Sequence, residues 1–503
     1  MRIFDHARRY HQNSKYTFND IKSTYREMIY ESKGILVKNY KKNTVIPLEK
    51  KIDYDTSDLS ADFQTSSRFG LFYELKPAPV SISQLSTLLH FSNGVTFIKD
   101  FGTRKIFLRA APSAGACYPI EMYLAANNVE GVEKGLYYYH PIDHHLILLE
   151  KGEIIENLYH LTYELDFVKQ APFFLLFSNI FSRNEWKYQK RALRYSMLDC
   201  GYILQNLNLT TSSLGLAINL LGDFKDDEIN TLLNFDTNDE ITLMLAALGI
   251  PERPLKAANY TFGMKVTEMD QAILSAEAQR AFYSMSSHTS PREGLVTVEV
   301  KLPFRKIPAI KKPSHHLIDL PKPIEKFGMS TIRTIENRRS VHNFQRISID
   351  VNDLATVLHF LYQIPALYNF PAFHTYLVVN DVNKLTNGLY CYHHADHKLE
   401  LLKKGTFRGD ISYLTLAQDA VFNASVAIFF ACHFRELDIF SDRGYRYAHF
   451  NIGMASEAVY LVATALNLGV RGIGNFFDEE LSAFFNLDLP DEYVLGGVVI
   501  GRK

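Results

Sequence analysis

The chain has 503 residues, more than one ordinary hydrophobic core accommodates, so its length predicts several domains. Hydrophobic residues make up 47% and charged residues 22%, as in soluble globular proteins, and no apolar run is long enough to span a membrane. The formal net charge of -1 gives no reason to expect nucleic acid or a membrane as partner. The charged start lacks the apolar stretch of a signal peptide, and we therefore expect a cytoplasmic enzyme.

Cysteine and histidine spacing gives no disulfide or metal signal. The four cysteines are scattered, without a CxxC pair, and we expect them to be reduced. Histidine pairs occur at 144–145 and 315–316, and such pairs in polar loops are usually solvated. We predict no metal site.

The predicted elements begin after an N-terminal extension, residues 1–60, whose role the pattern does not reveal. Leucines at helical spacing predict a helix at 81–91. Strands are predicted at 120–126, as a pair within 135–152, and at 172–178. A long helix with one small or apolar face then runs from about 194 to 214, and a final strand covers 241–249.

The region 253–325 is predicted to link two halves of the chain. Its segment 284–294 has the composition of a flexible loop, whereas 318–323 indicates an extended lead-in. The same order of elements then returns: a helix at 350–360, strands at 373–379, within 388–405 and at 426–432, a long helix, and a strand at 493–501.

This return reflects an internal repeat. GLYYYHPIDHHLILLEKG at 135–152 recurs as GLYCYHHADHKLELLKKG at 388–405, with twelve of eighteen positions identical. From Arg194 and Arg446 onward the two copies align at a displacement of 252 without a gap. We therefore predict a first domain at 61–252 and a second at 326–503, both of α+β class and packed as an intrachain pseudo-dimer.

The two copies have lost complementary motifs. The first carries RAAPSAGACYPIE (109–121), whose small residues let the backbone approach a ligand. The second lacks that turn but has the donor-rich ENRRSVHNF (336–344), RGIGNF (471–476) and a terminal Gly-Arg-Lys. The surviving motifs would build one composite site and leave the opposite interface without one.

Taken in order, the motifs RRSxxxF, PSAGAxYPxE, GLYxYxPxxH, KYxxRxxRYxxLDxG and GIGxF resemble the nitroreductase superfamily. The closer similarity is to its SagB/ThcOx-type branch, the azoline dehydrogenases of thiazole/oxazole-modified peptide biosynthesis. The resemblance covers about residues 65–250 and 330–503. It implies two tandem nitroreductase-like domains with about one FMN per chain between them.

The resemblance also implies which residues hold FMN. The phosphate would be bound by Arg338, Arg339, Ser340 and Arg502, with His342 and Lys503 nearby. The glycine loop would present backbone to the isoalloxazine at Gly472, Ile473 and Gly474. The turn from the first copy would cover the flavin with Pro112, Ser113, Ala114, Gly115 and Ala116.

Lys187 and Tyr188 are the predicted catalytic residues. They precede the long helix of the first copy, and their counterparts, Ile439 and Phe440, cannot transfer protons. In the family that the chain resembles, a Lys-Tyr pair at this motif is associated with catalysis. Aromatising an azoline requires a base: a neighbouring ammonium would favour the Tyr188 phenolate, and burial would favour a neutral lysine, so the choice between them stays open.

Three functions are compatible with these residues. The preferred one is oxidation of peptide thiazolines or oxazolines, with a modified precursor peptide as substrate and a cyclodehydratase as partner. The alternatives are an NAD(P)H-dependent flavin reductase acting on a small nitro, quinone or dehydroamino acid compound, and a non-catalytic flavin- or peptide-binding scaffold. The sequence leaves open the ring type, the peptide and further dimerisation.

Overall fold

The computed structural model describes residues 5–17, 36–40, 44–49, 56–67, 72–102, 105–255, 317–365, 373–440 and 442–503. The predicted loop at 284–294 and the histidine pair at 315–316 lie outside these residues. Within the described part of the chain, no helix combines the length and apolarity that a membrane crossing requires.

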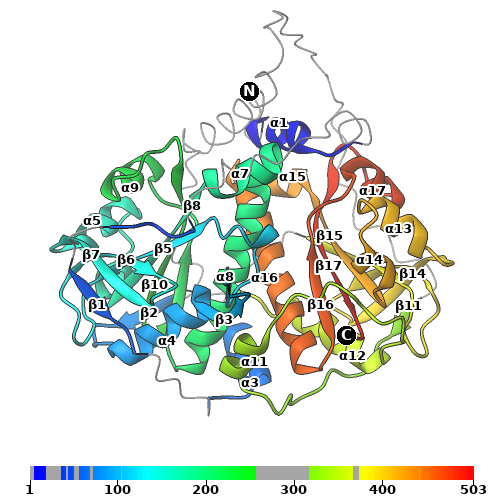
Figure 1. The fold of residues 1–503 in the computed structure, drawn as a ribbon, viewed down its shortest axis with the longest axis horizontal. Helices are drawn as coiled ribbons and strands as arrows, with labels where there is room; N and C mark the ends of the chain where they lie inside the picture. The colour runs from blue at the N-terminus through cyan, green and yellow to red at the C-terminus, as the bar shows by residue number, and fades with distance from the viewer. Residues whose placement is uncertain are drawn as a thin grey trace, which may run out of the picture.

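Two antiparallel sheets flank a central pair of helices (Figure 1). The first sheet runs in the order β1 (Val45–Pro47), β7 (His145–Lys151), β6 (Gly135–His140), β5 (Ile120–Ala126), β8 (Phe173–Ile180), β10 (Glu240–Pro254), β2 (Tyr73–Lys76), with β9 (Ala217–Leu221) also on β10. The second runs in the order β11 (Leu317–Asp319), β14 (Lys398–Lys404), β13 (Gly388–His393), β12 (His374–Val379), β15 (Val426–His433), β17 (Glu492–Gly501), β16 (Gly469–Ile473). The shared strand order confirms the predicted α+β duplication.

Shorter helices either cover the outer faces of the two sheets or pack beside the central pair of helices. Those of the first half are α4 (Ile82–Asn93), α5 (Ile154–Leu161), α6 (Asp166–Gln170), α7 (Ser182–Tyr188) and α9 (Asp226–Leu232). Those of the second half are α11 (Thr331–Asn337), α12 (Val351–Phe360), α13 (Arg408–Leu414), α14 (Asp419–Asn423), α15 (Phe434–Leu437) and α17 (Asp478–Phe484). Local sequence fixes where the two equivalent helices start: Ser81 and Gln84 form a capping box on α4, and Asp350 caps α12.

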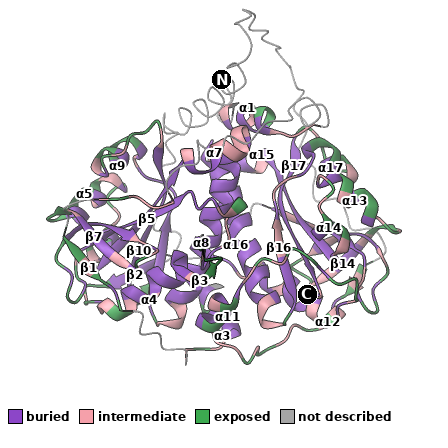
Figure 2. Cartoon of the chain, viewed as in Figure 1, coloured by how far each residue is buried: buried purple, intermediate pink, exposed green. Residues whose placement is uncertain are grey.

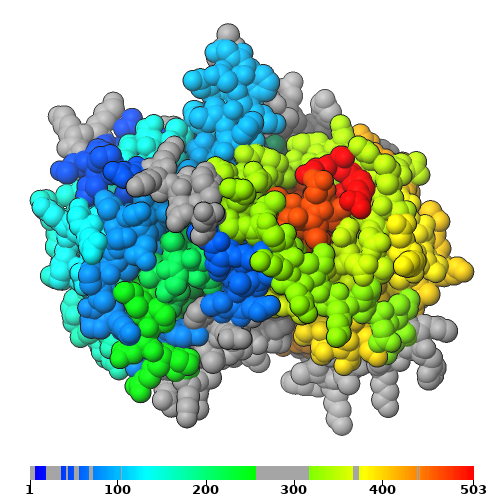
Figure 3. All heavy atoms as spheres, turned by 90° about the horizontal axis from the view of Figure 1, so that it is seen from below, coloured from blue at the N-terminus to red at the C-terminus, as the bar shows by residue number. Residues whose placement is uncertain are grey.

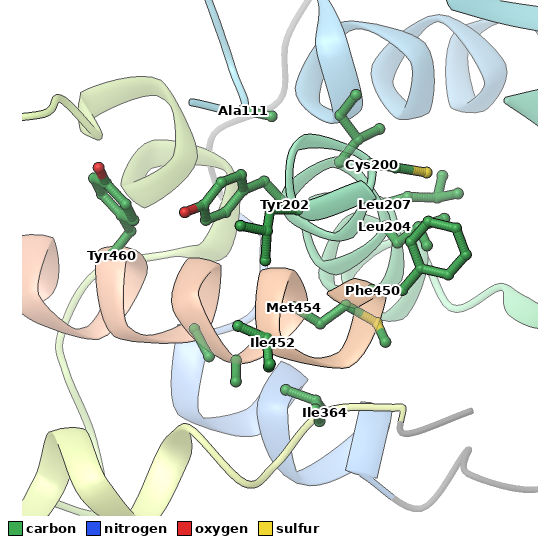
Figure 4. Packing of buried hydrophobic residues seen from close by; sticks show 14 of the residues in the cluster. Ala111, Cys200, Tyr202, Leu204, Leu207, Ile364, Phe450, Ile452, Met454 and Tyr460 are labelled. Carbon is green, nitrogen blue, oxygen red and sulfur yellow. The ribbon is translucent and has the colours of Figure 1, made fainter. Parts of the chain in front are cut away.

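The long helices α8 (Ala192–Ser213) and α16 (Arg443–Ala465) cross at the centre of the molecule and are buried along most of their length (Figure 2). They touch at two equivalent glycines, where a Cβ on Gly201 would lie 2.7 Å from the Cα of Gly453. Apolar side chains of both helices, including Leu204 and Met454, surround the crossing (Figure 4). The prediction of one apolar face was therefore too narrow, because nearly every face of these helices is covered.

Two equivalent ion clusters join the halves across this centre. Asp478 accepts from Arg191 Nη1 at 2.6 Å and lies 2.9 Å from Arg194 Nη2. On the other side Asp226 pairs with Arg443, and lies 3.1 Å from Arg446 Nη1. All these side chains are buried, so each half anchors the start of the other half's long helix.

The N-terminal segment contacts both halves. The helix α1 (Asp5–Ser14) lies on the second half, where the Ala7 amide donates to Asp442 at 2.8 Å, whereas β1 joins the first sheet. The helix α3 (Leu59–Ser67) also reaches the second half, since the ring of Phe63 lies 5.1 Å from that of Phe360. The boundary at residue 60 remains a prediction.

A hairpin that the sequence did not predict projects from the first half (Figure 3). Its strands, β3 (Val95–Asp100) and β4 (Lys105–Arg109), form a separate two-stranded sheet. Phe97, Ile98 and Phe101 are exposed on it. The base of the hairpin borders the cavity between the halves.

Candidate active site

A cavity of about 940 Å³ lies between the two halves, beside the helix crossing. The first half contributes the base of the hairpin, the 112–116 turn, the end of α7 and one face of α8. The second half contributes residues 337–342, part of α16, and the glycine segments 471–475 and 496–497. The predicted motifs of both copies therefore meet in one space.

The 112–116 turn lies on a buried carboxylate. Asp199 of α8 accepts from Ser113 Oγ at 2.5 Å and from the Ala114 amide at 3.1 Å. Gly115 has a φ of 60°, a conformation that glycine adopts without strain. A Cβ at Gly115 would lie 2.5 Å from both Lys187 Nζ and Tyr188 Oη, so the turn packs directly on the predicted catalytic pair.

Lys187 and Tyr188 end α7 and line the cavity. The next residue, Gln189, has a φ of 48° and turns the chain toward α8. Burial raises the pKa of Tyr188, with the charges of Cys117 and Asp199 adding to the effect. Burial therefore opposes the phenolate that a neighbouring ammonium was expected to favour, and the choice of base between Lys187 and Tyr188 stays open.

The two arginines of the predicted clasp reach across to the first half. Arg338 donates from Nε to the carbonyl of Ala110 at 2.8 Å, and its Nη1 is buried without a hydrogen-bond partner. Arg339 donates from Nη2 to the carbonyl of Thr96 at 3.3 Å, and its guanidinium lies 4.8 Å from the centre of the Phe97 ring. Both residues line the cavity and hold the hairpin base.

Further donors lie at this end of the cavity. Ser340 Oγ is 2.9 Å from Tyr460 Oη, which accepts the Gly472 amide at 2.7 Å. Arg471 Nη1 donates to His342 Nδ1 at 2.5 Å. Burial, and then the charges of Arg471 and Lys99, lower the pKa of His342, which favours the neutral ring.

The predicted C-terminal pair does not line the cavity. Arg502 Nη2 lies 3.7 Å from Asp353 Oδ2, and its backbone pairs with that of Gln345. The Lys503 carbonyl accepts from the side chain of Gln345 at 3.0 Å. The structure therefore brings together every other predicted site residue but leaves these two outside, and their role in binding phosphate stays a prediction.

The residues present fit an FMN molecule. The unpaired Arg338 Nη1, together with Arg471 and Lys99, suits a phosphate, and the volume is in the range of cofactor pockets. Gly472 and Gly474 leave no room for side chains, because a Cβ on either would crowd Tyr202 or Tyr195. The glycine backbone thus presents a flat surface to the cavity.

Three charged cavity residues were missed by the sequence analysis. Asp199 and Arg471 both lie in motifs that the repeat comparison had aligned, and their counterparts, Asn451 and Asn219, are uncharged. This difference in charge between the two copies could have identified Asp199 and Arg471 as candidate site residues. Lys99 had none, because it lies on the unpredicted hairpin.

The opposite interface lacks these groups among the described residues. Gly496 and Gly497 are replaced at a displacement of 252 by Met244 and Leu245, which are buried. The catalytic pair is replaced by Ile439 and Phe440. These differences agree with a single site per chain. The binding of about one FMN per chain stays a prediction.

One histidine of the pair at 144–145 differs from expectation. His144 is not solvated: it is 1% exposed, and its ring bonds Ser86 at 2.8 Å and Tyr139 at 2.9 Å. Its neighbour His145 lies with His140 and Asp143 in a group whose ligand atoms are within 4.8 Å of one another. The imidazole rings of His140 and His145 are stacked in parallel. The Nδ1 atom of His140 already accepts a hydrogen bond from the amide of Asp143.

Comparison with known proteins agrees with the fold and the motifs. The model of the nitroreductase family matches residues 72–250 and 335–502, more than half of the chain and once in each half. A solved structure from Anabaena variabilis, assigned as a nitroreductase, superposes with a TM-score of 0.76 at 25% identity over 99% of both chains. The tandem arrangement is therefore shared by a structure of the same length.

Three relatives each match about a third of the chain. MJ1384 of Methanocaldococcus jannaschii, assigned as a nitroreductase, is 33% identical over 34% of this chain and 82% of its own length. The trifolitoxin-processing protein TfxB of Rhizobium leguminosarum bv. trifolii and the microcin B17-processing protein McbC of Escherichia coli are each 26% identical. The match covers 35% and 28% of this chain, and 49% and 54% of TfxB and McbC.

Proposed function

Because the chain belongs to the nitroreductase family, we propose that it is an FMN-dependent dehydrogenase that oxidises thiazolines or oxazolines of a peptide to thiazoles or oxazoles. The relatives TfxB and McbC, which process peptide toxins by name, support a peptide substrate. The resemblance of the motifs to the SagB/ThcOx-type branch supports the same chemistry. We further propose a cyclodehydratase as the partner that makes the azoline.

The observation that carries the proposal is the division of the cavity between the halves. The predicted catalytic pair and the 112–116 turn come from the first half, whereas the cations and the glycine segments come from the second. Lys187 and Tyr188 have no proton-transferring equivalent at the opposite interface. The predicted catalytic pair, the turn, the cations and the glycine segments are all retained at the same interface. This supports a catalytic site more than it supports a non-catalytic scaffold.

Bound FMN would supply the acceptor for the hydride equivalent that leaves the azoline ring. The other product of aromatisation is a proton from carbon, which a side chain of this protein must take. Tyr188 keeps its own proton because burial raises its pKa. Lys187 is thus the proposed base, and the Tyr188 hydroxyl would orient the substrate by donating a hydrogen bond.

Arg338, Arg471 and Lys99 would hold the FMN phosphate through charge-assisted hydrogen bonds. The glycine segment 472–474 would lie along the flavin ring, and the 112–116 turn would keep water from the reacting atoms. Both halves are needed for this arrangement, since neither contains the cations and the catalytic pair together.

The test is to measure FMN content and then turnover of a synthetic azoline peptide. We expect about one FMN per chain by absorbance, and a decrease in peptide mass equal to two hydrogen atoms when dioxygen is present. Purified protein that neither contains FMN nor binds it when FMN is added would refute the proposal. So would flavin-loaded protein that leaves azoline peptides of both ring types unchanged.

A second candidate is an NAD(P)H-dependent reductase of a small molecule. The relative of higher identity, MJ1384, is assigned as a nitroreductase and matches over most of its own length, which favours this candidate. Rapid bleaching of the flavin by NADPH without oxygen would support the reductase. Slow bleaching together with azoline oxidation would support the dehydrogenase.

A further inference from the structure

Asp199 is a buried acid whose side chain accepts two hydrogen bonds from the 112–116 turn. Its two oxygens accept from Ser113 Oγ at 2.5 Å and from the Ala114 amide at 3.1 Å. Ser113 Oγ in turn accepts the amide of Tyr118 at 2.9 Å, which closes the turn on its far side. The carboxylate therefore fixes the start of the turn directly and its far side through Ser113.

The turn transmits this position to the predicted catalytic pair. Gly115 lies between Asp199's two partners and the end of α7, and a Cβ there would lie 2.5 Å from Lys187 Nζ and from Tyr188 Oη. A shift of the turn by a fraction of a bond length would thus change the space available to both side chains.

The second copy lacks both the acid and the turn that the first copy has. At the displacement of 252, Asp199 is replaced by Asn451, in the copy that lacks the Pro-Ser-Ala-Gly-Ala sequence. An amide fills nearly the same volume as a carboxyl group, so packing alone does not explain the difference. The charged residue, Asp199, is present in the copy that also has the 112–116 turn.

The surroundings of Asp199 make its charge responsive to pH. Burial raises its pKa to about 7, although the bonds from Ser113 and Ala114 oppose the rise. The titratable groups that interact with it are Tyr118, Tyr188, Tyr202 and Cys200, and burial raises the pKa of each. These neighbours are uncharged near neutrality, so Asp199 is the group that changes charge there.

We propose that Asp199 is a positioning residue: its ionised carboxylate holds the 112–116 turn against Lys187 and Tyr188, and its protonation releases the turn. The proposal rests on the proposed function only in treating these two residues as the reactive pair. Above neutral pH the turn donates two hydrogen bonds to a charged carboxylate. Below neutral pH it bonds a neutral acid, and such bonds are about half as strong.

The single tryptophan of the chain offers a test that needs no substrate. Trp186 directly precedes Lys187 in α7, is half-buried, and donates to the carbonyl of Arg183 at 2.8 Å. Its fluorescence would be followed against pH in the protein as purified. We expect a transition with a midpoint near pH 7 in the wild type and none in Asp199→Asn.

Two variants complete the experiment. Ser113→Ala removes a hydrogen bond that lowers the pKa of Asp199 and should move the transition to higher pH, which keeps the test decisive if Asp199→Asn fails to fold. The matched control is Asp62→Asn: Asp62 is a buried acid of α3, its pKa is raised by burial to about 6, and it does not line the cavity. This control should keep the transition of the wild type.

The proposal is overturned if the wild type shows no transition near pH 7, or if Asp199→Asn keeps it. Turnover provides a second readout: kcat of the wild type should fall about tenfold on acidification through this range, as expected for loss of one charge-assisted hydrogen bond, with KM little changed. Since fluorescence does not depend on the substrate, failure of azoline oxidation would refute the proposed function and leave this result intact.

Discussion

The hydroxyl of Tyr188 is a hydrogen-bond donor at neutral pH, because burial raises its pKa. Lys187 lies on the same helical turn, with its Nζ 5.4 Å from the centre of the Tyr188 ring. We therefore propose that the two side chains divide the work of one site: the amine would take a proton, and the phenol would orient the group that loses it.

Lys187→Ala should lower kcat for azoline oxidation by at least about 10²-fold, the usual contribution of a positioned base. Tyr188→Phe should have a smaller effect on kcat and should raise KM, because it removes a donor and leaves the base. FMN content should stay unchanged in both. Tyr413→Phe, an exposed tyrosine outside the cavity, is the control. Equal activity of Lys187→Ala and wild type would contradict the assignment.

Arg338 has one nitrogen without a partner and lines the cavity. Arg338→Lys should weaken FMN binding by about 10-fold or more, because a lysine cannot replace a planar guanidinium at two contacts. Riboflavin, which lacks the phosphate, supplies the control ligand. Equal weakening of FMN and riboflavin would show that Arg338 acts by holding the hairpin and not by binding phosphate.

Individual site residues were predicted where the two copies differ in length or motif. The turn, the clasp, the glycine segment and the catalytic pair all carried such a difference. The protonation of Tyr188 and Asp199 could not be predicted, because it depends on burial supplied by chain segments from both copies. The placement of Arg502 away from the cavity likewise depends on an ion pair with Asp353, a residue of no motif.

At the scale of elements, the crossing of α8 and α16 sets how closely the halves approach. Gly201 and Gly453 are equivalent in the repeat and meet each other at this point. Close contact of two helix backbones requires residues without side chains. The same two helices carry Asp199 and Tyr460 to the cavity wall, so the crossing also sets the width of the site.

Gly201→Ala should lower the free energy of unfolding by about 1–3 kcal/mol, as overpacking does in a tight core. The added Cβ would overlap the backbone of Phe450 and Gly453. Urea denaturation measures the change. Gly409→Ala is the matched control: it lies in the helix α13 with open space around it, and should stabilise slightly. A Gly201→Ala protein as stable as the control would show that the helices separate at little cost.

The main strands and helices were predicted to within a few residues, because long apolar runs and helical spacing are local signals. The strand predicted at 120–126 is β5, and the helix predicted at 350–360 corresponds to α12. The short strands β1 and β2 and the β3–β4 hairpin were not predicted. Each of these four strands has six residues or fewer. The strands β1 and β2 pair only with strands that are far away in the sequence.

For the whole molecule, the two ion clusters add buried charge pairs to the apolar contacts that join the halves. Burial alone would raise the pKa of Asp478, but Arg191 and Arg194 lower it below its ordinary value. A lowered pKa means that the ionised acid stabilises the folded state above the unfolded pKa of about 3.8, and that this contribution is lost as the pH falls through the folded value.

Asp478→Ala should reduce the free energy of unfolding by about 3–5 kcal/mol at pH 7, because two buried arginines lose their partner. The difference from wild type should shrink below pH 4, where the wild-type carboxylate is itself being protonated. Urea titrations at pH 7 and at acid pH measure both effects. Asp410→Ala, an exposed acid on α13, is the control. A constant difference across this pH range would contradict the assigned charge.

The covalent joining of the halves gives the site a property that two separate chains would lack. Docking of one half on the other is intramolecular, so its effective concentration does not change when the protein is diluted. The cavity should therefore remain assembled at nanomolar protein, where a pair of separate chains would depend on mass action. The joined halves can also be altered one at a time: a substitution in α8 leaves α16 unchanged, whereas in a symmetric dimer every substitution would enter both interfaces.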